Sequence, residues 1–218
     1  MADFRKLTLI SLLAGIFAGL LLTVFQHYLT QPLIFAAEQL EVPMPEHSHE
    51  WQPADGFQRN FFTFLFNTLT GLGFSLLLSA GMYLKNHNGY LRGLAWGLAG
   101  YAVFFIAPSL GLPPELPGTE SAALLSRQTW WLLTALLTAG GLFCLYFGAT
   151  RNWKSSGFVL LVVPHLIGAP QPDFESSLAP EALQQQFVIF SALNNGVFWL
   201  VLGAVSGLLL KKIEFNHD

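Results

Sequence analysis

The side chains best suited to bind a metal ion lie in one short run of this 218-residue chain, Glu46-His47-Ser48-His49-Glu50. Neutral imidazole and carboxylate groups are ligands for borderline divalent cations such as cobalt, nickel and zinc. In an extended chain, side chains repeat with a period of two residues, so His47 and His49 would share one face. Short histidine-rich runs do bind metals. For an arbitrary protein, the plainer interpretation is a solvated acidic loop without a ligand role.

Two further histidines, His27 and His165, each lie near the end of a long apolar segment. An ionisable group within a membrane span is costly and usually marks a pathway or a site. Each histidine is equally well explained as an interfacial residue that hydrogen-bonds a backbone carbonyl, and both interpretations stay open. Glu115 and Glu120 follow the third apolar segment, where they form either part of an acidic vestibule or a hydrated surface rim.

The composition is that of an integral membrane protein. Charged residues make up 11% of the chain, against roughly 25% in an average soluble domain. Apolar residues make up 53%, and the six tryptophans and five tyrosines suit anchors at a membrane interface. These proportions exclude a soluble enzyme, a disordered chain and a nucleic-acid binder. The single cysteine, Cys144, excludes a disulfide framework and a cysteine-based metal cluster.

The fold class is therefore predicted to be all-α, with six transmembrane helices, since a span needs ~20 apolar residues. The first exceeds the apolar core of a signal peptide, roughly 7–15 residues, and is expected to be retained. The fifth, 155–169, reaches only about 22 Å of a core of about 30 Å. Pro164 also interrupts it, so it is either a short span or a re-entrant segment. The other five are approximately 7–29, 61–84, 93–112, 129–149 and 187–210.

The loop charges give an orientation. With six spans, eight of the ten Lys and Arg residues lie on one side, and the positive-inside rule places that side and both termini in the cytoplasm. The other side carries Arg59, Arg127 and ten of the thirteen acids. The chain is thus predicted to be one transmembrane domain, 1–218, with an acidic, histidine-containing outer loop at 30–58. The other two outer loops are 113–128 and 170–186.

Similar residues recur at the ends of the spans, which indicates three helical hairpins that open outward. Pro108 and Pro164 interrupt the third and fifth spans in similar Pro/Gly-rich surroundings. Chance resemblance within a biased composition explains the pattern equally well. If the repeats are real, paired interruptions at matching positions indicate a transport site.

Several polar and small residues inside or beside the spans are predicted to be structural. Asn67, Asn194 and Asn195 could offer oxygens to an ion, but such residues more often hydrogen-bond neighbouring helices. Arg59 and Arg127 are interpreted as interfacial cations, paired with acids such as Glu115 and Glu120. Glycines spaced four residues apart are typical of close helix packing; they are Gly15–Gly19, Gly93–Gly97 and Gly203–Gly207.

No catalytic constellation is recognisable. The sequence contains no phosphate-binding loop ending in Gly-Lys-Ser/Thr, no His-Glu-x-x-His motif and no Gly-x-Ser-x-Gly elbow, which are signatures of nucleotide hydrolysis, zinc proteolysis and acyl transfer. No predicted span contains an acid in its interior. We therefore expect neither an enzyme nor a resident cofactor.

Three strings carry a family resemblance: Trp51–Arg59, Arg92–Gly100, and Ala107–Gly118 followed by Arg127-Gln128 and Trp130-Trp131. With them, nearly the whole chain resembles the CbtA family of predicted cobalt transporter subunits. The resemblance implies a bacterial inner-membrane protein for cobalt uptake in cobalamin synthesis. It also implies a partner, the single-span, His-rich subunit CbtB. The family is often described with five spans, one fewer than predicted here.

The expected function is uptake of a divalent metal, and the family resemblance implies that this metal is cobalt. The outer loop would capture the ion loosely, and a binding site at the outer mouth would receive it. The expected metal ligands are His27, Glu46, His47, His49, Glu50, Glu115 and His165. The alternatives are a non-transporting scaffold or metal-sensing subunit of a partner transporter, and transport of another divalent metal such as nickel.

Overall fold

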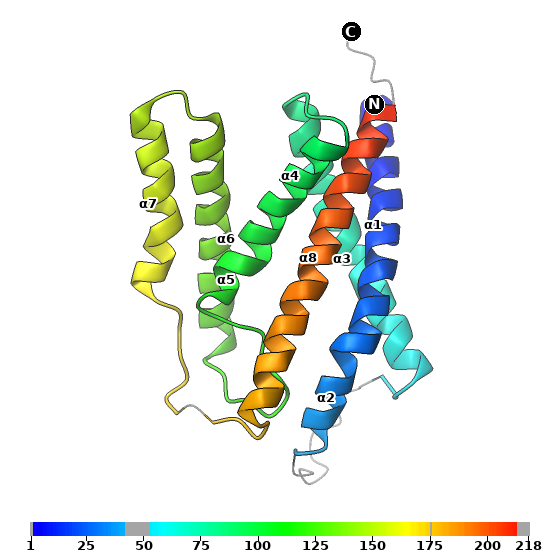
Figure 1. Ribbon diagram of the computed structural model, residues 1–218, viewed down its shortest axis with the longest axis vertical. Coiled ribbons are helices and arrows are strands. Elements are labelled where there is room, and N and C mark those ends of the chain that lie inside the picture. The colour runs from blue at the N-terminus through cyan, green and yellow to red at the C-terminus, as the bar shows by residue number, and fades with distance from the viewer. Residues whose placement is uncertain (1, 42–52, 175, 213–218) are drawn as a thin grey trace. The chain divides into compact units, whose positions relative to one another are not determined.

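A computed structural model describes residues 2–41, 53–174 and 176–212 (Figure 1). In this part of the chain the regular structure is helical, apart from one isolated antiparallel bridge between Thr119 and Ser177. The all-α prediction is therefore confirmed. The helices are α1 (Ala2–Leu29), α2 (Gln31–Glu38), α3 (Phe57–Leu84), α4 (Tyr90–Tyr101), η1 (Ala102–Ile106), α5 (Ala107–Ser109), α6 (Leu124–Phe147), α7 (Arg151–Ile167) and α8 (Glu181–Lys212).

Five helical stretches are long and apolar enough to cross a membrane. The protein is therefore an α-helical, multi-span membrane protein, as predicted. The segment predicted as the fifth span forms α7, which has 17 residues, and a sixth span through it stays a prediction. The five stretches are Phe4–Leu29, Phe57–Leu84, Tyr90–Ser109, Leu124–Phe147 and Glu181–Lys212.

The observed helices differ from the predicted segments where residues outside the apolar runs also form helix. Residues 31–38, expected in the outer loop, form α2, and Pro32 fits there because a proline is tolerated in the first turn. The third span continues through η1, a π-helical turn in which Ala107 N–H donates to Ala102 C=O. Helix α7 begins at Arg151, is capped by Thr150, whose hydroxyl accepts from Trp153 N–H, and contains Pro164 in its last turn.

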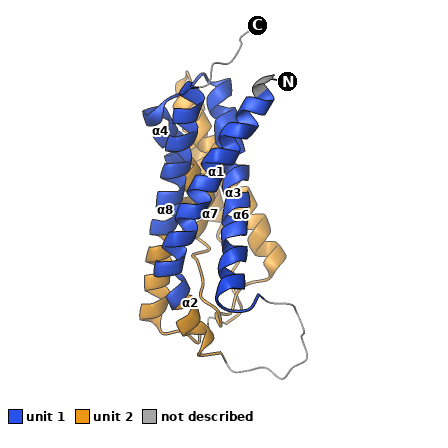
Figure 2. Cartoon of the chain, turned by 90° about the vertical axis from the view of Figure 1, so that its right-hand side faces the viewer, with its two compact units in different colours: residues 1–32, 42–98, 193–218 blue, residues 33–41, 99–192 orange. Residues whose placement is uncertain are grey.

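The chain divides into two compact units (Figure 2). Unit 1 comprises residues 1–32, 42–98 and 193–218, and unit 2 comprises 33–41 and 99–192. The boundaries fall inside α2, α4 and α8, so each of these helices contributes residues to both units. The prediction of a single domain over the whole chain is not tested by this division.

Helices α1 and α3 pack antiparallel in unit 1, with backbone against backbone at their glycines. A Cβ atom added to Gly71 would lie 2.7 Å from Gly15 O, and one added to Gly19 would lie 2.7 Å from Thr68 Cα. Only residues without a side chain allow helices to approach this closely. The first predicted hairpin, which these two helices form, is therefore present.

Helix α8 meets the unit 1 part of α4 in the same way. A Cβ atom at Gly93 would lie 2.2 Å from Gly203 O, and Gly89 N–H donates to Gly207 C=O at 2.7 Å. The register brings the turn between α3 and α4 beside the last turn of α8. Basic residues of these two segments, such as Lys85 and Lys211, therefore lie at one end of unit 1, as the predicted charge distribution requires.

Unit 2 contains an antiparallel pair, α6 and α7, and a small apolar cluster where α2, two loops and the start of α8 meet. Gly141 of α6 faces Gly157 of α7, since a Cβ on Gly141 would lie 2.9 Å from Gly157 O. The apolar cluster consists of Leu33, Ala37, Leu116 and Ala179, with Ile34, Leu183, Phe187 and Phe190 packed against it. It anchors two loops, one of which carries the predicted site residue Glu115.

Candidate functional site

The predicted metal ligands fall into three groups. Glu46, His47, His49 and Glu50 lie in 42–52, outside the described residues. His27 belongs to unit 1, whereas Glu115 and His165 belong to unit 2. In the described part of the chain, no group of three or more His, Cys, Asp and Glu residues is placed to hold a metal ion. A shared site of His27, Glu115 and His165 therefore stays a prediction.

His27 is held by a chain of two amide side chains. It lies exposed in the last turn of α1, next to Tyr28, whose ring it meets edge-on at 5.0 Å. Its Nδ1 lies 2.6 Å from Gln31 Oε1, and Gln31 Nε2 donates to Asn60 Oδ1 on α3 at 3.1 Å. Both ends of the Gln31 amide are thus engaged, one by α1 and the other by α3.

With the Gln31 amide in this orientation, one tautomer of the neutral His27 ring completes the hydrogen bonds. Because Gln31 Nε2 donates to Asn60, the Gln31 oxygen faces His27 and can only accept. The neutral His27 ring must then donate from Nδ1, which leaves the lone pair on Nε2. Metal-ligating histidines commonly use this arrangement, in which the second N–H is bound by an oxygen that orients the ring. Among the three predicted ligands in the described part of the chain, His27 therefore has the surroundings that best suit metal binding.

His87, in the turn between α3 and α4, has the opposite tautomer. The Trp96 indole N–H donates to His87 Nδ1 at 3.1 Å. An indole nitrogen can only donate, so the proton of neutral His87 lies on Nε2, which then has no lone pair for a metal. The two histidines belong to the same unit, and they form a natural pair of test and control positions.

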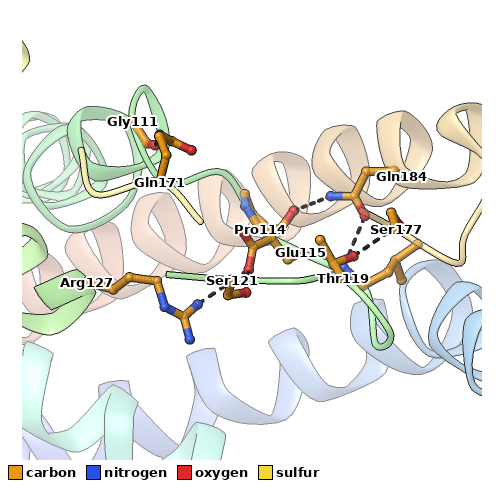
Figure 3. Close-up of polar contacts among 10 residues, drawn as sticks. Gly111, Pro114, Glu115, Thr119, Ser121, Arg127, Gln171, Ser177 and Gln184 are labelled. Atoms are coloured by element: carbon orange, nitrogen blue, oxygen red, sulfur yellow. Dashed lines mark hydrogen bonds and ion pairs between the residues drawn. The ribbon is translucent and has the colours of Figure 1, made fainter. Parts of the chain in front are cut away.

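Glu115 is already engaged by two neighbours in unit 2 (Figure 3). Arg127 Nη1 lies 3.4 Å from Glu115 Oε2, and the Ser121 hydroxyl donates to the same oxygen. The predicted pairing of Arg127 with Glu115 is confirmed, while Arg59 pairs with Asp55 at 3.1 Å, a partner not predicted from the sequence. A metal ion at Glu115 would have to share this carboxylate with a guanidinium, so its first role in the observed arrangement is to anchor the loop.

The loop that carries Glu115 is tied to the loop between α7 and α8 and to α8 itself. Gln184 on α8 donates through Nε2 to Pro114 C=O at 2.7 Å and accepts from Leu116 N–H at 3.1 Å. Ser176 donates to Glu120 at 3.1 Å. Gln184 was not identified from the sequence, although it lies in a run of three glutamines immediately before the last predicted span. These bonds give Glu115 a rigid setting.

His165 lies half-buried in the last turn of α7 and meets Trp130 of α6 edge-on, with ring centroids 6.2 Å apart. Trp130 is itself buried. The contact explains the position of the ring by packing, and a ligand role for His165 stays a prediction. Pro164, beside it, is also fully buried.

A polar cluster between α1, α3 and α8 in unit 1 was only partly predicted. Asn67 Nδ2 donates to Thr23 Oγ1 at 3.0 Å and to Gln26 Oε1 at 2.7 Å, which confirms Asn67 as a residue that bonds a neighbouring helix. Asn194 Nδ2 donates to Thr30 Oγ1 at 3.5 Å. Thr23, Gln26 and Thr30 were missed, although their spacing puts Thr23 and Gln26 on one face of α1 and Thr30 directly after its end.

Comparison with known proteins identifies the family. The chain matches the family model CbtA, described as "Probable cobalt transporter subunit", over residues 4–211. No curated protein and no solved structure matches the chain. The family match covers nearly the whole chain, including all of the five described helical stretches that could cross a membrane except the last residue, Lys212. The chain therefore belongs to the CbtA family of probable cobalt transporter subunits.

Proposed function

We propose that this protein carries Co²⁺ inward across a bacterial inner membrane, with both of its ends in the cytoplasm. The family match supports cobalt as the cargo. The gathering of Lys85 and Lys211 at one end of unit 1 supports the orientation, because basic residues are enriched in cytoplasmic loops. On this orientation His27 lies towards the outer surface, at the far end of α1 from Arg5 and Lys6.

The observation that carries the chemistry is the geometry at His27. Gln31 and Asn60 hold the ring and its tautomer, so that Nε2 presents its lone pair at the end of a membrane helix. Imidazole nitrogen is a good ligand for Co²⁺. In this proposal His27 is the ligand that receives the ion at the outer mouth. Glu115 and His165 stay proposed as further ligands.

The acidic outer loops would supply the ion to that site. Clustered carboxylates raise the local concentration of cations, and His47 and His49 with Glu46 and Glu50 would capture the metal loosely. A dication moving inward down a potential of 100 mV gains about 4–5 kcal/mol, at ~2.3 kcal/mol per charge. Net uptake therefore needs no ATP hydrolysis on this chain.

The alternative is a scaffold or metal-sensing subunit that moves no ion by itself. The word "subunit" in the family description favours this alternative, since it implies partner subunits. A small single-span, His-rich protein of the CbtB type would be the expected partner. Nickel is the alternative cargo, because cobalt and nickel share ligands.

Uptake of ⁵⁷Co²⁺ by cells separates these proposals. Cells that express this chain alone should accumulate ⁵⁷Co²⁺ above vector-only cells, and a tenfold excess of unlabelled Co²⁺ should compete better than Ni²⁺. Accumulation that occurs only when the single-span partner is co-expressed would support the scaffold or sensor in its place. Stronger competition by Ni²⁺ than by Co²⁺ would contradict cobalt as the cargo.

A further inference from the structure

The buried polar cluster of unit 1 contains two oxygens that converge on one donor. The Thr23 hydroxyl gives its own proton to Gly19 C=O at 2.8 Å, so its oxygen faces Asn67 as an acceptor. Gln26 Oε1 faces the same Asn67 Nδ2. The NH₂ group of Asn67 therefore occupies a position at which two lone pairs meet, as a cation would.

Asn194 is linked to this group through Thr30 and carries an unsatisfied acceptor. Its Oδ1 is buried and has no hydrogen-bond partner, and the residue as a whole is 2% exposed. Its Nδ2 donates to Thr30, one helical turn after Gln26, and Thr30 in turn donates to Gln26 C=O at 3.2 Å. An unpartnered carbonyl oxygen costs free energy in a buried setting, and a bound cation would remove that cost.

The ligands of the cluster favour a cation with one charge over a cation with two. The α1, α3 and unit 1 α8 segments contain no Asp or Glu in residues 4–29, 57–84 and 193–212, so the available ligands are neutral amide and hydroxyl oxygens. The desolvation cost of an ion rises with the square of its charge, and neutral oxygens offset it far better for one charge than for two. Co²⁺ also prefers imidazole to such ligands.

The close packing of the helices around the cluster favours a small cation. One turn away, a Cβ atom on Gly19 would lie 2.7 Å from Thr68 Cα, so α1 and α3 have little freedom to separate. Rotating the Asn67 amide by 180° exchanges its nitrogen for its oxygen. Three oxygens, from Thr23, Gln26 and Asn67, then surround one point in a confined space, which suits a small ion.

We propose that Thr23, Gln26 and Asn67, with Asn194 beside them, form a binding site for a small alkali cation of the Na⁺ class. In the observed structure the Asn67 NH₂ group satisfies the two oxygens that the cation would bind, and cation binding would turn the amide so that its oxygen joins them. The site lies about 9 Å from the outer end of α1, at ~1.5 Å per residue. A coupling of Na⁺ influx at this site to metal uptake rests, in addition, on the proposed function.

The binding site is tested by thermal unfolding of the purified full-length protein in detergent. NaCl, KCl and choline chloride are compared at equal ionic strength. Na⁺ should raise the unfolding midpoint saturably, by on the order of 5 °C when its concentration exceeds the dissociation constant about a hundredfold. K⁺ should raise it less. Equal midpoints in NaCl and choline chloride would overturn the proposal.

Three variants assign the effect to this site. Thr23→Val removes the hydroxyl oxygen at nearly constant shape and should abolish the Na⁺ shift, whereas Thr23→Ser keeps the oxygen and should retain it. Ser75→Ala removes another buried hydroxyl of unit 1, which contacts Ser206 at 2.9 Å, and should also retain the shift. If Thr23→Val is folded in choline chloride and keeps the full Na⁺ shift, the proposed ligands are wrong.

The failures of the site and of the proposed function are distinguishable. A Na⁺ shift that depends on Thr23, in a protein that moves no ⁵⁷Co²⁺, would support the site and contradict the transport of cobalt. Uptake of ⁵⁷Co²⁺ without any shift of the unfolding midpoint by Na⁺ would support the transport of cobalt and contradict the Na⁺ site. Uptake that is equally fast in Na⁺ and choline media would overturn the coupling.

Discussion

Replacing Gly203 by alanine should destabilise the protein by about 3 kcal/mol. The added Cβ atom would lie 2.3 Å from Gly93 O and 2.7 Å from Gly97 Cα. Both neighbours are backbone atoms, which cannot turn aside as a side chain would, so the helices α4 and α8 must separate. Overpacking of a well-packed interface typically costs 1–3 kcal/mol, and occasionally more. The unfolding midpoint of the purified protein in detergent measures the change.

Gly73→Ala is the matched control. Gly73 lies on α3, and a Cβ atom there would have no atom within 4 Å. Alanine is favoured over glycine in a helix by about 1 kcal/mol, so this variant should be as stable as the unchanged protein, or slightly more stable. An unchanged midpoint for Gly203→Ala would show that α4 and α8 do not approach through these glycines.

Replacing His27 by alanine should lower the initial rate of ⁵⁷Co²⁺ uptake at least about tenfold. The substitution removes the Nε2 lone pair that we assign to the metal. It leaves the α1–α3 packing at Gly15 and Gly19 unchanged, because His27 is exposed. Gln31→Leu should have a smaller effect in the same direction, because it removes the oxygen that orients the ring. Such supporting residues typically change metal affinity 10–100-fold.

His87→Ala is the control for this prediction. His87 accepts the Trp96 indole N–H through Nδ1, so its neutral ring offers no second lone pair to a metal. We expect uptake within about twofold of the unchanged protein, after correction for the amount of protein in the membrane. Equal losses in His27→Ala and His87→Ala would contradict a specific role of His27, because a general loss of folding would explain both.

Local features of the sequence were sufficient to predict most of the spans. A run of apolar residues long enough to cross a bilayer depends only on neighbours in the chain, and five such runs form long helices. The helix ends were predicted less well. Helix α6 begins at Leu124, five residues before the predicted 129, because Ser126, Arg127 and Gln128 are polar and yet continue a helix at the membrane surface.

The partners of the packing residues could not be predicted. The spacing of Gly15 and Gly19 indicates a closely packed face, but spacing does not identify the facing residue, Gly71, which lies on another helix. The same holds at His27. Its type and position in the sequence mark a possible ligand, but its tautomer depends on Asn60, 29 residues after Gln31 in the chain.

For Glu115 the residue type predicts a metal ligand, but the surroundings in the structure show a different role. A carboxylate in an outer loop is a reasonable metal ligand, and the sequence does not show how its charge is used. In the structure, Arg127 and Ser121 both bind its Oε2 atom. The sequence had also suggested the pairing with Arg127, so both roles were anticipated, and the structural role is the one observed.

The central claim is that this chain moves Co²⁺ across a membrane by way of His27. Its most direct test is Co²⁺ influx into liposomes that contain only the purified protein and a Co²⁺-quenched dye, under an inside-negative potential. We predict quenching well above that of protein-free liposomes, and at least about tenfold slower with His27→Ala. Quenching no faster than in protein-free liposomes, or equal rates for the two proteins, would contradict the claim.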